Sequence, residues 1–416
     1  MSEPIRLLAG KRIVLGVTGS IAVYKAADLA SKLTQTGARV DVVMTESAQR
    51  FVTPLTFQAV TGRPVYTDLW QGGSAGLPTH IAHVGLGEGA DVLFIAPCSA
   101  NTLAKLAQGL ADDLLSVTAL AARCPLILAP AMDGSMYEHP ATQANVQTLL
   151  QRGAAVIEPV WGRFASGLEG RGRLPEVPAL IGHLRHLLGM RWGALAGRRI
   201  VVTAGGTREA IDPVRYVGNH SSGKQGYAIA QAALDAGAQV TLISSAHLLA
   251  PVGVRFIQVE SAADVLEAVL ASIPQADALI MAAAVADFRP QQAADRKIKK
   301  SDDESLTLTL GRTADVLLRV AEVRAASGWP RVVVGFAAES HDLLANAQAK
   351  LSTKRLDLLV ANDVSAPDAG FAVDTNRVVL LRPAQAPEAL PLLSKQAVAE
   401  RIVDEVARLI RAADDA

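Results

Sequence analysis

Short apolar runs alternate along the chain with longer amphipathic stretches rich in alanine and leucine. In the first half, runs without polar alternation predict strands at Lys11–Val17, Ala38–Met44, Asp91–Ala96, Pro125–Ala129 and Ala154–Ile157. Strands that are apolar on both faces are typical of a parallel sheet covered by helices. The alternation of such strands with helices therefore predicts a doubly wound α/β domain.

The second half begins the same pattern again. Its predicted strands are Arg199–Thr203, Gln239–Ser244, Ala278–Ala282, Val332–Gly335 and Leu358–Ala361. Between the halves, Leu180–Gly197 contains a helix-like run that ends in RWGALAG, which we interpret as a linker. We therefore expect two α/β domains, at residues 1–190 and 191–416.

Composition narrows the class of protein. A chain of 416 residues that is 50% hydrophobic is too long for one core. Its 40 basic and 40 acidic residues balance, which gives no basis for a nucleic-acid or acidic-membrane partner. The two cysteines, Cys98 and Cys124, favour a reducing compartment over a disulfide framework. No signal-peptide core or 18-residue apolar run occurs, so we expect a cytoplasmic protein.

The stretch Gly205–Gly226 partly matches a phosphate-binding loop. Gly218, Gly223 and Lys224 fit the pattern, but Gln225 stands where a hydroxyl would bind Mg²⁺, and the preceding strand ends too early. The pattern alone leaves both a triphosphate site and a chance match open. A predicted helix N-terminus would attract anions here, next to several side-chain donors: Asn219, His220, Ser221, Ser222 and Lys224.

A second glycine turn, Gly16–Ala22, follows the first strand and leads into a helix. Its backbone N–H groups could bind a phosphate, although a tight turn without a ligand is the alternative. A dinucleotide site would also need an acidic residue at the end of the second strand, where Met44 and Thr45 stand. The turn therefore favours a mononucleotide such as FMN, and disfavours a nicotinamide oxidoreductase.

Three further segments are candidates for ligand contacts. Residues 97–102 and 130–136 follow strands and either bind a ligand or cap helices. Residues 165–174 are too glycine-rich for a regular element and form either a functional lid or a disordered loop. His80 and His83 lie near no cysteine or carboxylate cluster, so we expect no metal site there.

Many motifs occur in an order that resembles one known family. GVTGSIAVYKAADL, HVGLGEGAD, APCSANTLAKLAQGLADDLL, PAM and GRGRLPE are similar to FMN-dependent cysteine decarboxylases, and DPVRYVGNHSSGKQG, AAAVADF, KIKK, GFAAES and LVANDVS to phosphopantothenate–cysteine ligases. Over nearly its whole length the chain resembles bacterial bifunctional enzymes of coenzyme A biosynthesis. The resemblance implies a flavodoxin-like decarboxylase domain, a Rossmann-like ligase domain, small-molecule substrates, and a homo-oligomer of flavoprotein trimers joined by ligase dimers.

The resemblance also implies residues for the decarboxylase half. His83 takes the place of the active-site histidine, because it precedes Asp91 as in the family pattern. The implied FMN contacts are Gly19, Ser20, Ile21, Ala22, Thr45, Ser99, Ala100 and Asn101.

Two positions depart from the family pattern. Asp133 replaces an asparagine that contacts the substrate carboxylate, and Ser166 replaces a cysteine that protonates an enethiol after thiol oxidation and loss of CO₂. Serine is a poor proton donor, and an ionised Asp133 would repel a carboxylate. The alternative is therefore a ligase whose first half is only a flavin-binding scaffold.

The ligase half keeps the family pattern, which implies activation of 4'-phosphopantothenate by CTP, with Mg²⁺, and attack of cysteine on the acyl-cytidylate. The negative charge of the triphosphate and of the acyl-cytidylate requires positioned cations and amides. Lys297 would neutralise the triphosphate and Asn219 would stabilise an oxyanion, although the lysines alone read as solvated charges. The implied CTP contacts are Met281, Ala282, Ala283, Asp287, Lys297, Thr313, Ala314, Asp315, Val316, Phe336, Lys350 and Lys354.

Overall fold

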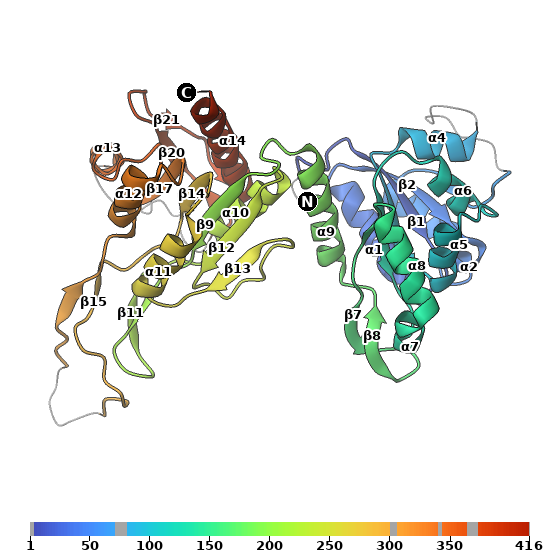
Figure 1. The fold of residues 1–416 in the computed structure, drawn as a ribbon, viewed down its shortest axis with the longest axis horizontal. Helices are drawn as coiled ribbons and strands as arrows, with labels where there is room; N and C mark the ends of the chain where they lie inside the picture. Colours follow the sequence, from blue (N-terminus) through green and yellow to red (C-terminus); the bar gives the residue numbers. More distant parts are fainter. Residues whose placement is uncertain (1–3, 71–80, 300–305, 340–342, 364–372, 416) are drawn as a thin grey trace. The chain divides into compact units, whose positions relative to one another are not determined.

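A computed structural model describes residues 4–70, 81–299, 306–339, 343–363 and 373–415. The chain divides into two compact units, residues 1–185 and 186–416 (Figure 1). Each unit is built on one large sheet with helices packed against it, which confirms the predicted doubly wound α/β class.

The first unit contains a parallel sheet in the order β3-β2-β1-β4-β5-β6. Its strands are β1 (Arg12–Val17), β2 (Arg39–Met44), β3 (Val65–Tyr66), β4 (Val92–Cys98), β5 (Leu126–Pro130) and β6 (Ala155–Val156). Its helices are α1 (Val23–Gln35), α2 (Glu46–Gln49), α3 (Pro54–Thr61), α4 (Ala82–Gly89), α5 (Ala100–Gln108), α6 (Leu114–Ala121), α7 (Gly134–Glu138) and α8 (Pro140–Gln151). Helix α9 (Val177–Trp192) begins in this unit and ends in the second. The order reverses between β1 and β4, where open α/β sheets bind ligands at their carboxyl ends.

The glycine-rich segment 165–174 corrects the sequence prediction, because much of it is a regular element. β7 (Val160–Arg163) and β8 (Glu169–Arg173) form an antiparallel hairpin. The glycines allow close approach: a Cβ on Gly172 would lie 2.3 Å from the carbonyl oxygen of Met132. Backbone pairing and tight packing, which the local composition does not reveal, therefore hold this segment in place.

The second unit contains a larger sheet in the order β13-β12-β9-β14-β17-β18-β20-β21. It is parallel from β13 to β18, and the last two strands pair antiparallel. The strands are β9 (Arg199–Ala204), β12 (Gln239–Ser244), β13 (Arg255–Gln258), β14 (Ala278–Met281), β17 (Val332–Glu339), β18 (Leu358–Asp363), β20 (Val378–Leu381) and β21 (Glu388–Ala389). The order reverses between β9 and β14, so this edge is the second expected ligand position.

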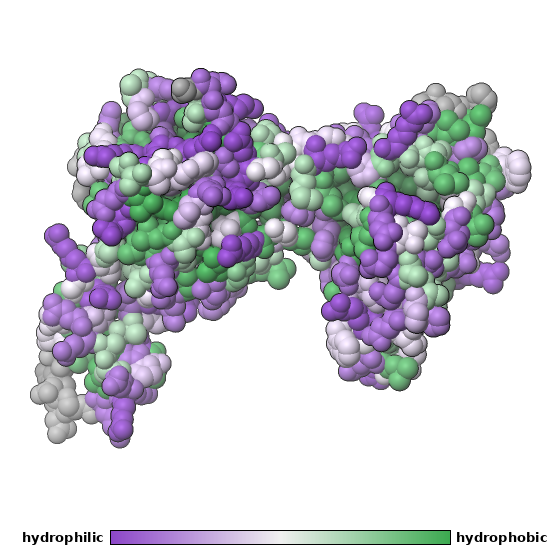
Figure 2. Space-filling view, in the orientation of Figure 1, coloured by the Kyte–Doolittle hydropathy of each residue, from purple (hydrophilic) through white to green (hydrophobic). Residues whose placement is uncertain are grey.

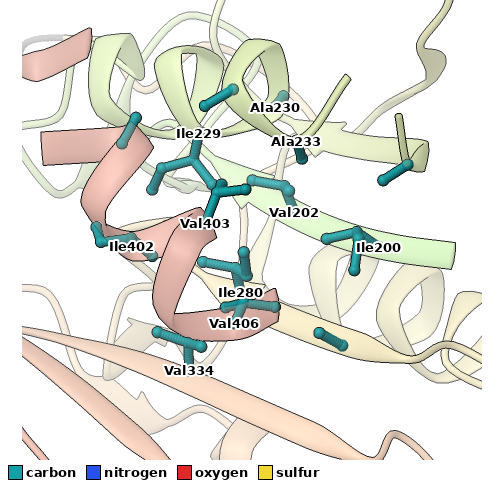
Figure 3. Close-up of a cluster of buried hydrophobic side chains, with 14 of the residues drawn as sticks. Ile200, Val202, Ile229, Ala230, Ala233, Ile280, Val334, Ile402, Val403 and Val406 are labelled. Carbon is teal, nitrogen blue, oxygen red and sulfur yellow. The ribbon is translucent and has the colours of Figure 1, made fainter. Parts of the chain in front are cut away.

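Helices α10 (Lys224–Asp235) and α14 (Lys395–Asp414) pack on one face of this sheet, as Figure 3 shows. Val403 and Val406 of α14 lie against Ile229 of α10 and Val202 of β9 in one buried cluster. Burial of each such side chain contributes about 1.5–3 kcal/mol. A separate cluster forms with the other helices, α11 (Ala262–Ser272), α12 (Val316–Ser327) and α13 (Leu343–Thr353).

In the described part of this unit, three two-stranded antiparallel sheets lie outside the main sheet. They are β10 (Arg208–Ala210) with β11 (Tyr216–Gly218), β15 (Phe288–Pro290) with β16 (Leu310–Arg312), and β19 (Thr375–Asn376) with β22 (Leu393–Ser394). The first of them separates β9 from α10, so the strand does not lead directly into the helix as in a phosphate-binding loop. Helix α10 begins at Lys224, directly after Gly223, which adopts a left-handed φ of 77°.

Two candidate active sites

The first unit has a pocket of about 510 Å³ at the carboxyl end of its sheet. It collects the turn after β1, the start of α5, the loop after β5 and the β7–β8 hairpin. The predicted residues that line it are Gly19, Ser20, Ile21, Ala22, Ser99, Ala100, Asp133 and Ser166. Four segments far apart in the sequence therefore meet as the strand order predicts.

A buried hydroxyl joins the two turns that form the floor of this pocket. Thr18 Oγ1 donates to the Pro97 carbonyl at 2.8 Å and accepts from the Ser99 backbone N–H at 2.8 Å. Ser99 then caps α5 by accepting from the Thr102 N–H. The end of β1 and the start of α5 are thus held in register, with Ser20 and Ser99 both facing the pocket.

The two residues that depart from the family pattern are in contact. Ser166 Oγ donates to Asp133 Oδ2 at 2.9 Å, and the Ser135 N–H and hydroxyl donate to Asp133 Oδ1. These hydrogen bonds lower the pKa of Asp133, and the bond from Ser166 has the largest effect. The carboxylate is therefore ionised at neutral pH, and it ties the turn of the hairpin to the start of α7.

Other predicted residues of this half lie elsewhere. His83 is the second residue of α4, half-buried, and is not part of the described pocket lining. Thr45 caps α2 through the Ala48 N–H, and Asn101 is the second residue of α5; neither is part of that lining. His80 lies outside the described residues.

Sequence reasoning missed three cations of the same pocket. Lys25 is buried and its ammonium donates to the Leu174 carbonyl at 3.0 Å and to the Glu176 carboxylate at 2.6 Å. Arg163 and Arg173 line the pocket from the hairpin. The only available signal was a lysine on the apolar face of the helix after the glycine turn, which reads as an ordinary surface charge.

The second unit has a pocket of about 710 Å³ at the point where its strand order reverses. Asn219 lines this pocket, and so does every predicted nucleotide contact except Lys297. The contacts that line it are Met281, Ala282, Ala283, Asp287, Thr313, Ala314, Asp315, Val316, Phe336, Lys350 and Lys354. These residues come from the end of β14, the start of α12, strand β17 and helix α13. The structure therefore brings one predicted set together from four segments.

Hydrogen bonds fix the backbone of this pocket. Thr313 Oγ1 donates to the Ala286 carbonyl at 2.6 Å, and the Ala283 N–H donates to Thr203 Oγ1 at 3.1 Å. Asp315 caps α12 and forms a 2.9 Å ion pair with Lys354. Burial opposes ionisation of Asp315, but Lys354 and the Leu318 N–H outweigh it and lower its pKa.

Lys395 and Asn376, which sequence reasoning missed, also line this pocket. Lys395 is buried at the first position of α14, and Lys224 occupies the same position in α10. The Gln225 side chain bridges two segments: its Nε2 donates to the Lys395 carbonyl, and its Oε1 accepts from Asn376 Nδ2. Burial, and then the Lys224 ammonium, lower the pKa of Lys395. Positive charge and two helix N-termini therefore meet in the lining of the cavity, which suits an anion.

The two proposed catalytic residues of this half occupy different places. Asn219 Nδ2 donates to the Val285 carbonyl at 3.1 Å at the edge of the pocket. Lys297 is exposed in the loop after β15, and the described lining of the pocket does not include it.

Among the residues that the structure describes, no group of three or more histidine, cysteine, aspartate or glutamate side chains could hold a metal ion. None of the helices found there is long and apolar enough to cross a membrane.

Two family models match the chain. The model described as Flavoprotein matches residues 1–189, and the model described as DNA/pantothenate metabolism flavoprotein C-terminal domain matches residues 195–410.

Similar proteins cover both halves together. The coenzyme A biosynthesis bifunctional protein CoaBC of Bacillus subtilis is 46% identical over 97% of this chain and 98% of its own length. The protein of that name from Mycobacterium tuberculosis is 48% identical over 95% of this chain and 96% of its own. A crystal structure of the C-terminal domain of a CoaBC protein is 38% identical and covers 53% of this chain and 100% of its own, with a TM-score of 0.45.

Proposed function

The chain belongs to the family of bifunctional coenzyme A biosynthesis proteins, and from that premise we propose which of its residues carry each reaction. It is a bifunctional enzyme, with an FMN-dependent phosphopantothenoylcysteine decarboxylase in the first unit and a phosphopantothenate–cysteine ligase in the second. The nucleotide, the metal ion, the site residues and the oligomer are our proposals.

For the ligase half we propose CTP as the activating nucleotide, accompanied by Mg²⁺. The observation that carries this proposal is the single pocket lined by all the implied CTP contacts except Lys297. Its lining lysines, Lys224 and Lys395 among them, suit phosphates, and Phe336 and Met281 offer apolar surface to a base. Mg²⁺ usually binds through substrate phosphates with one or two carboxylates, and Asp287 lines the pocket.

For the decarboxylase half, the first pocket fits FMN in its chemistry. Hydroxyls of Ser20 and Ser99 at two glycine- or serine-bearing turns suit a phosphate, whereas Ile21, Met132 and Phe164 offer apolar surface to a ring system. Bound FMN supplies reversible two-electron oxidation of the substrate. The protein's own residues must hold the substrate and deliver protons.

The ionised Asp133 requires a different partner for the substrate carboxylate. Arg163 and Arg173 line the same pocket, and a guanidinium pairs well with a carboxylate. We therefore propose that the substrate carboxylate faces these arginines, and that Asp133 instead orients Ser166 through their 2.9 Å hydrogen bond. Proton delivery to the enethiol then falls to His83 or Ser166.

We also propose a cytoplasmic homo-oligomer of flavoprotein trimers joined by ligase dimers. His83 and Lys297 both lie outside the described lining of the pockets in their own chain, so contacts between copies would allow them to serve a neighbour. Figure 2 shows hydrophobic surface in the region of α4 and α6, where Leu120 is 61% exposed. Both cysteines are free thiols, which is consistent with a reducing compartment.

One experiment on the purified full-length protein tests these proposals. An absorbance scan should show bound flavin, and synthetic phosphopantothenoylcysteine should release CO₂. With phosphopantothenate and cysteine, amide formation should require CTP and stop when Mg²⁺ is chelated. A yellow protein that forms the amide but releases no CO₂ would instead indicate a ligase with a flavin-binding scaffold, and equal use of other nucleotides would contradict the assignment of CTP.

A further inference from the structure

We propose that Asp212 is a positioning residue of the ligase half, which fixes the loop at residues 291–299 and with it Lys297. The proposal rests on the catalytic role of Lys297 given above. Asp212 lies in the turn between β10 and β11, remote in sequence from that loop and outside the described lining of the pocket.

The contact between the turn and the loop is made to the backbone. Asp212 Oδ2 accepts from the Ile298 N–H at 3.1 Å, and Arg215 Nη2 donates to the Ile298 carbonyl at 2.9 Å. A third bond runs from the Ala294 N–H to the Ile211 carbonyl at 2.9 Å. The turn thus holds the loop on both sides of Lys297, at residues 294 and 298.

Hydrogen bonds within the turn hold the Asp212 carboxylate in a fixed orientation. Asp212 is 3% exposed and its Oδ1 accepts from the N–H groups of Val214 and Arg215 at 2.8 and 2.9 Å. Its Oδ2 accepts from Arg215 Nε at 2.9 Å and Nη2 at 2.5 Å. The Arg215 guanidinium, with burial opposing it, holds the pKa of Asp212 well below its usual range. The carboxylate is therefore a permanent, oriented acceptor for Ile298.

The loop has few other constraints of its own. Between β15 and residue 299 no helix or strand is present in the described structure, and Asp295, Arg296, Lys297 and Lys299 are exposed. Ile298 is the half-buried residue among them. A backbone clamp at Ile298 is accordingly the feature that restricts where the neighbouring ammonium can lie.

The test compares Asp212→Ala with Asp264→Ala in the full-length, flavin-loaded protein. Asp264 is a matched control, because its carboxylate also accepts two backbone N–H groups, from Glu260 and Ser261, but at the start of α11. Each variant is digested briefly with trypsin under native conditions, and cleavage after Arg296 and Lys297 is followed by mass spectrometry. Cytidylate formation without cysteine is measured in parallel.

We expect Asp212→Ala to raise cleavage after Arg296 and Lys297 and to lower kcat for cytidylate formation by at least about tenfold, the loss typical of one hydrogen bond to a charged group. KM for CTP should stay unchanged, because the pocket lining is intact. Asp264→Ala should change neither the tryptic cleavage after Arg296 and Lys297 nor the rate of cytidylate formation. A merely structural role of Asp212 would instead alter KM and kcat together, or thermal stability alone.

Two results would overturn the proposal. Unchanged cleavage in Asp212→Ala would show that Asp212 does not hold the loop. Raised cleavage with normal cytidylate formation would show that the loop is held but that Lys297 does not serve activation, which refutes its proposed role separately. If Asp212→Ala fails to fold, Ile298→Pro removes the N–H donor while leaving the Asp212–Arg215 pair in place. Because trypsin does not cleave a Lys–Pro bond, cleavage after Arg296 alone is followed in this variant, together with cytidylate formation.

Discussion

Replacing Asn219 by aspartate should stop the ligase after its first half-reaction. The side-chain amide has two N–H groups, and one of them donates to the Val285 carbonyl at 3.1 Å. That bond orients the second N–H at the edge of the pocket, where an oxyanion would form as the cysteine amine attacks the acyl-cytidylate. Asn219→Asp removes both donors and places a negative charge beside the developing oxyanion.

The expected magnitude follows from these contacts. Loss of one oxyanion donor typically lowers turnover by about 10² to 10³. The added charge should bring amide formation to the upper end of that range. The fold should survive, because Asn219 is exposed and its one hydrogen bond contributes about 0.5–1.5 kcal/mol net, a small part of a typical 5–15 kcal/mol.

The assay separates the two half-reactions by rapid quench and mass spectrometry. With CTP and phosphopantothenate the variant should accumulate the cytidylate at a rate near that of the wild type, and addition of cysteine should yield little amide. Gln258→Glu is a matched control, because it also converts an amide that donates to a backbone carbonyl, that of Val259, on the edge strand β13. Amide formation at the wild-type rate, or failure to form the cytidylate, would refute the role of Asn219.

Four further expectations concern other residues. Lys297→Gln should block cytidylate formation itself, and the same quench experiment would refute this if the cytidylate accumulates as in Asn219→Asp. His83→Asn should leave the flavin spectrum unchanged but abolish CO₂ release; release at the wild-type rate would remove its assignment. Ser166→Cys should speed enethiol reduction, followed by stopped-flow absorbance, whereas an inactive Ser166→Ala would show that the hydroxyl is essential. Glu405 forms ion pairs with Arg408 and Arg382. The hydrogen bond from Arg408 contributes most and, with Arg382, outweighs the opposing effect of burial, so the pKa of Glu405 falls to about 2. This pairing stabilises the fold above the unfolded pKa of about 4.3 and is lost as pH falls towards 2. Glu405→Gln should therefore unfold at lower urea than the wild type at pH 6, and the difference should shrink below pH 4; a constant difference would contradict this.

The central strands of both sheets could be predicted from sequence for a definite physical reason. A parallel strand covered on both faces has no polar alternation, so β12 at Gln239–Ser244 was predicted with the bounds that the structure has. The outer elements have no such signature. β7 and β8 depend on pairing with each other, and their glycines are explained only by what a Cβ would meet in space.

Some residues of the two sites could likewise be predicted from the sequence, and others could not. Turns that follow predicted strands could be placed at one sheet edge in advance, and the predicted contacts in both pockets lie there. Lys395 and Asn376 belong to segments whose approach depends on the small two-stranded β19–β22 sheet, and no local pattern indicates it. The roles of His83 and Lys297 stay predictions, because neither side chain reaches the described pocket lining of its own chain.

Helix α14 has two roles that would ordinarily be kept apart. Its first residue, Lys395, lines the ligase pocket, and Val398, Ile402, Val403 and Val406 complete the core against α10 and the sheet. A substitution in the core that shifts this helix would therefore also shift the ammonium at its start. Selection for a more robust fold and selection for faster chemistry thus act on the same twenty-residue element.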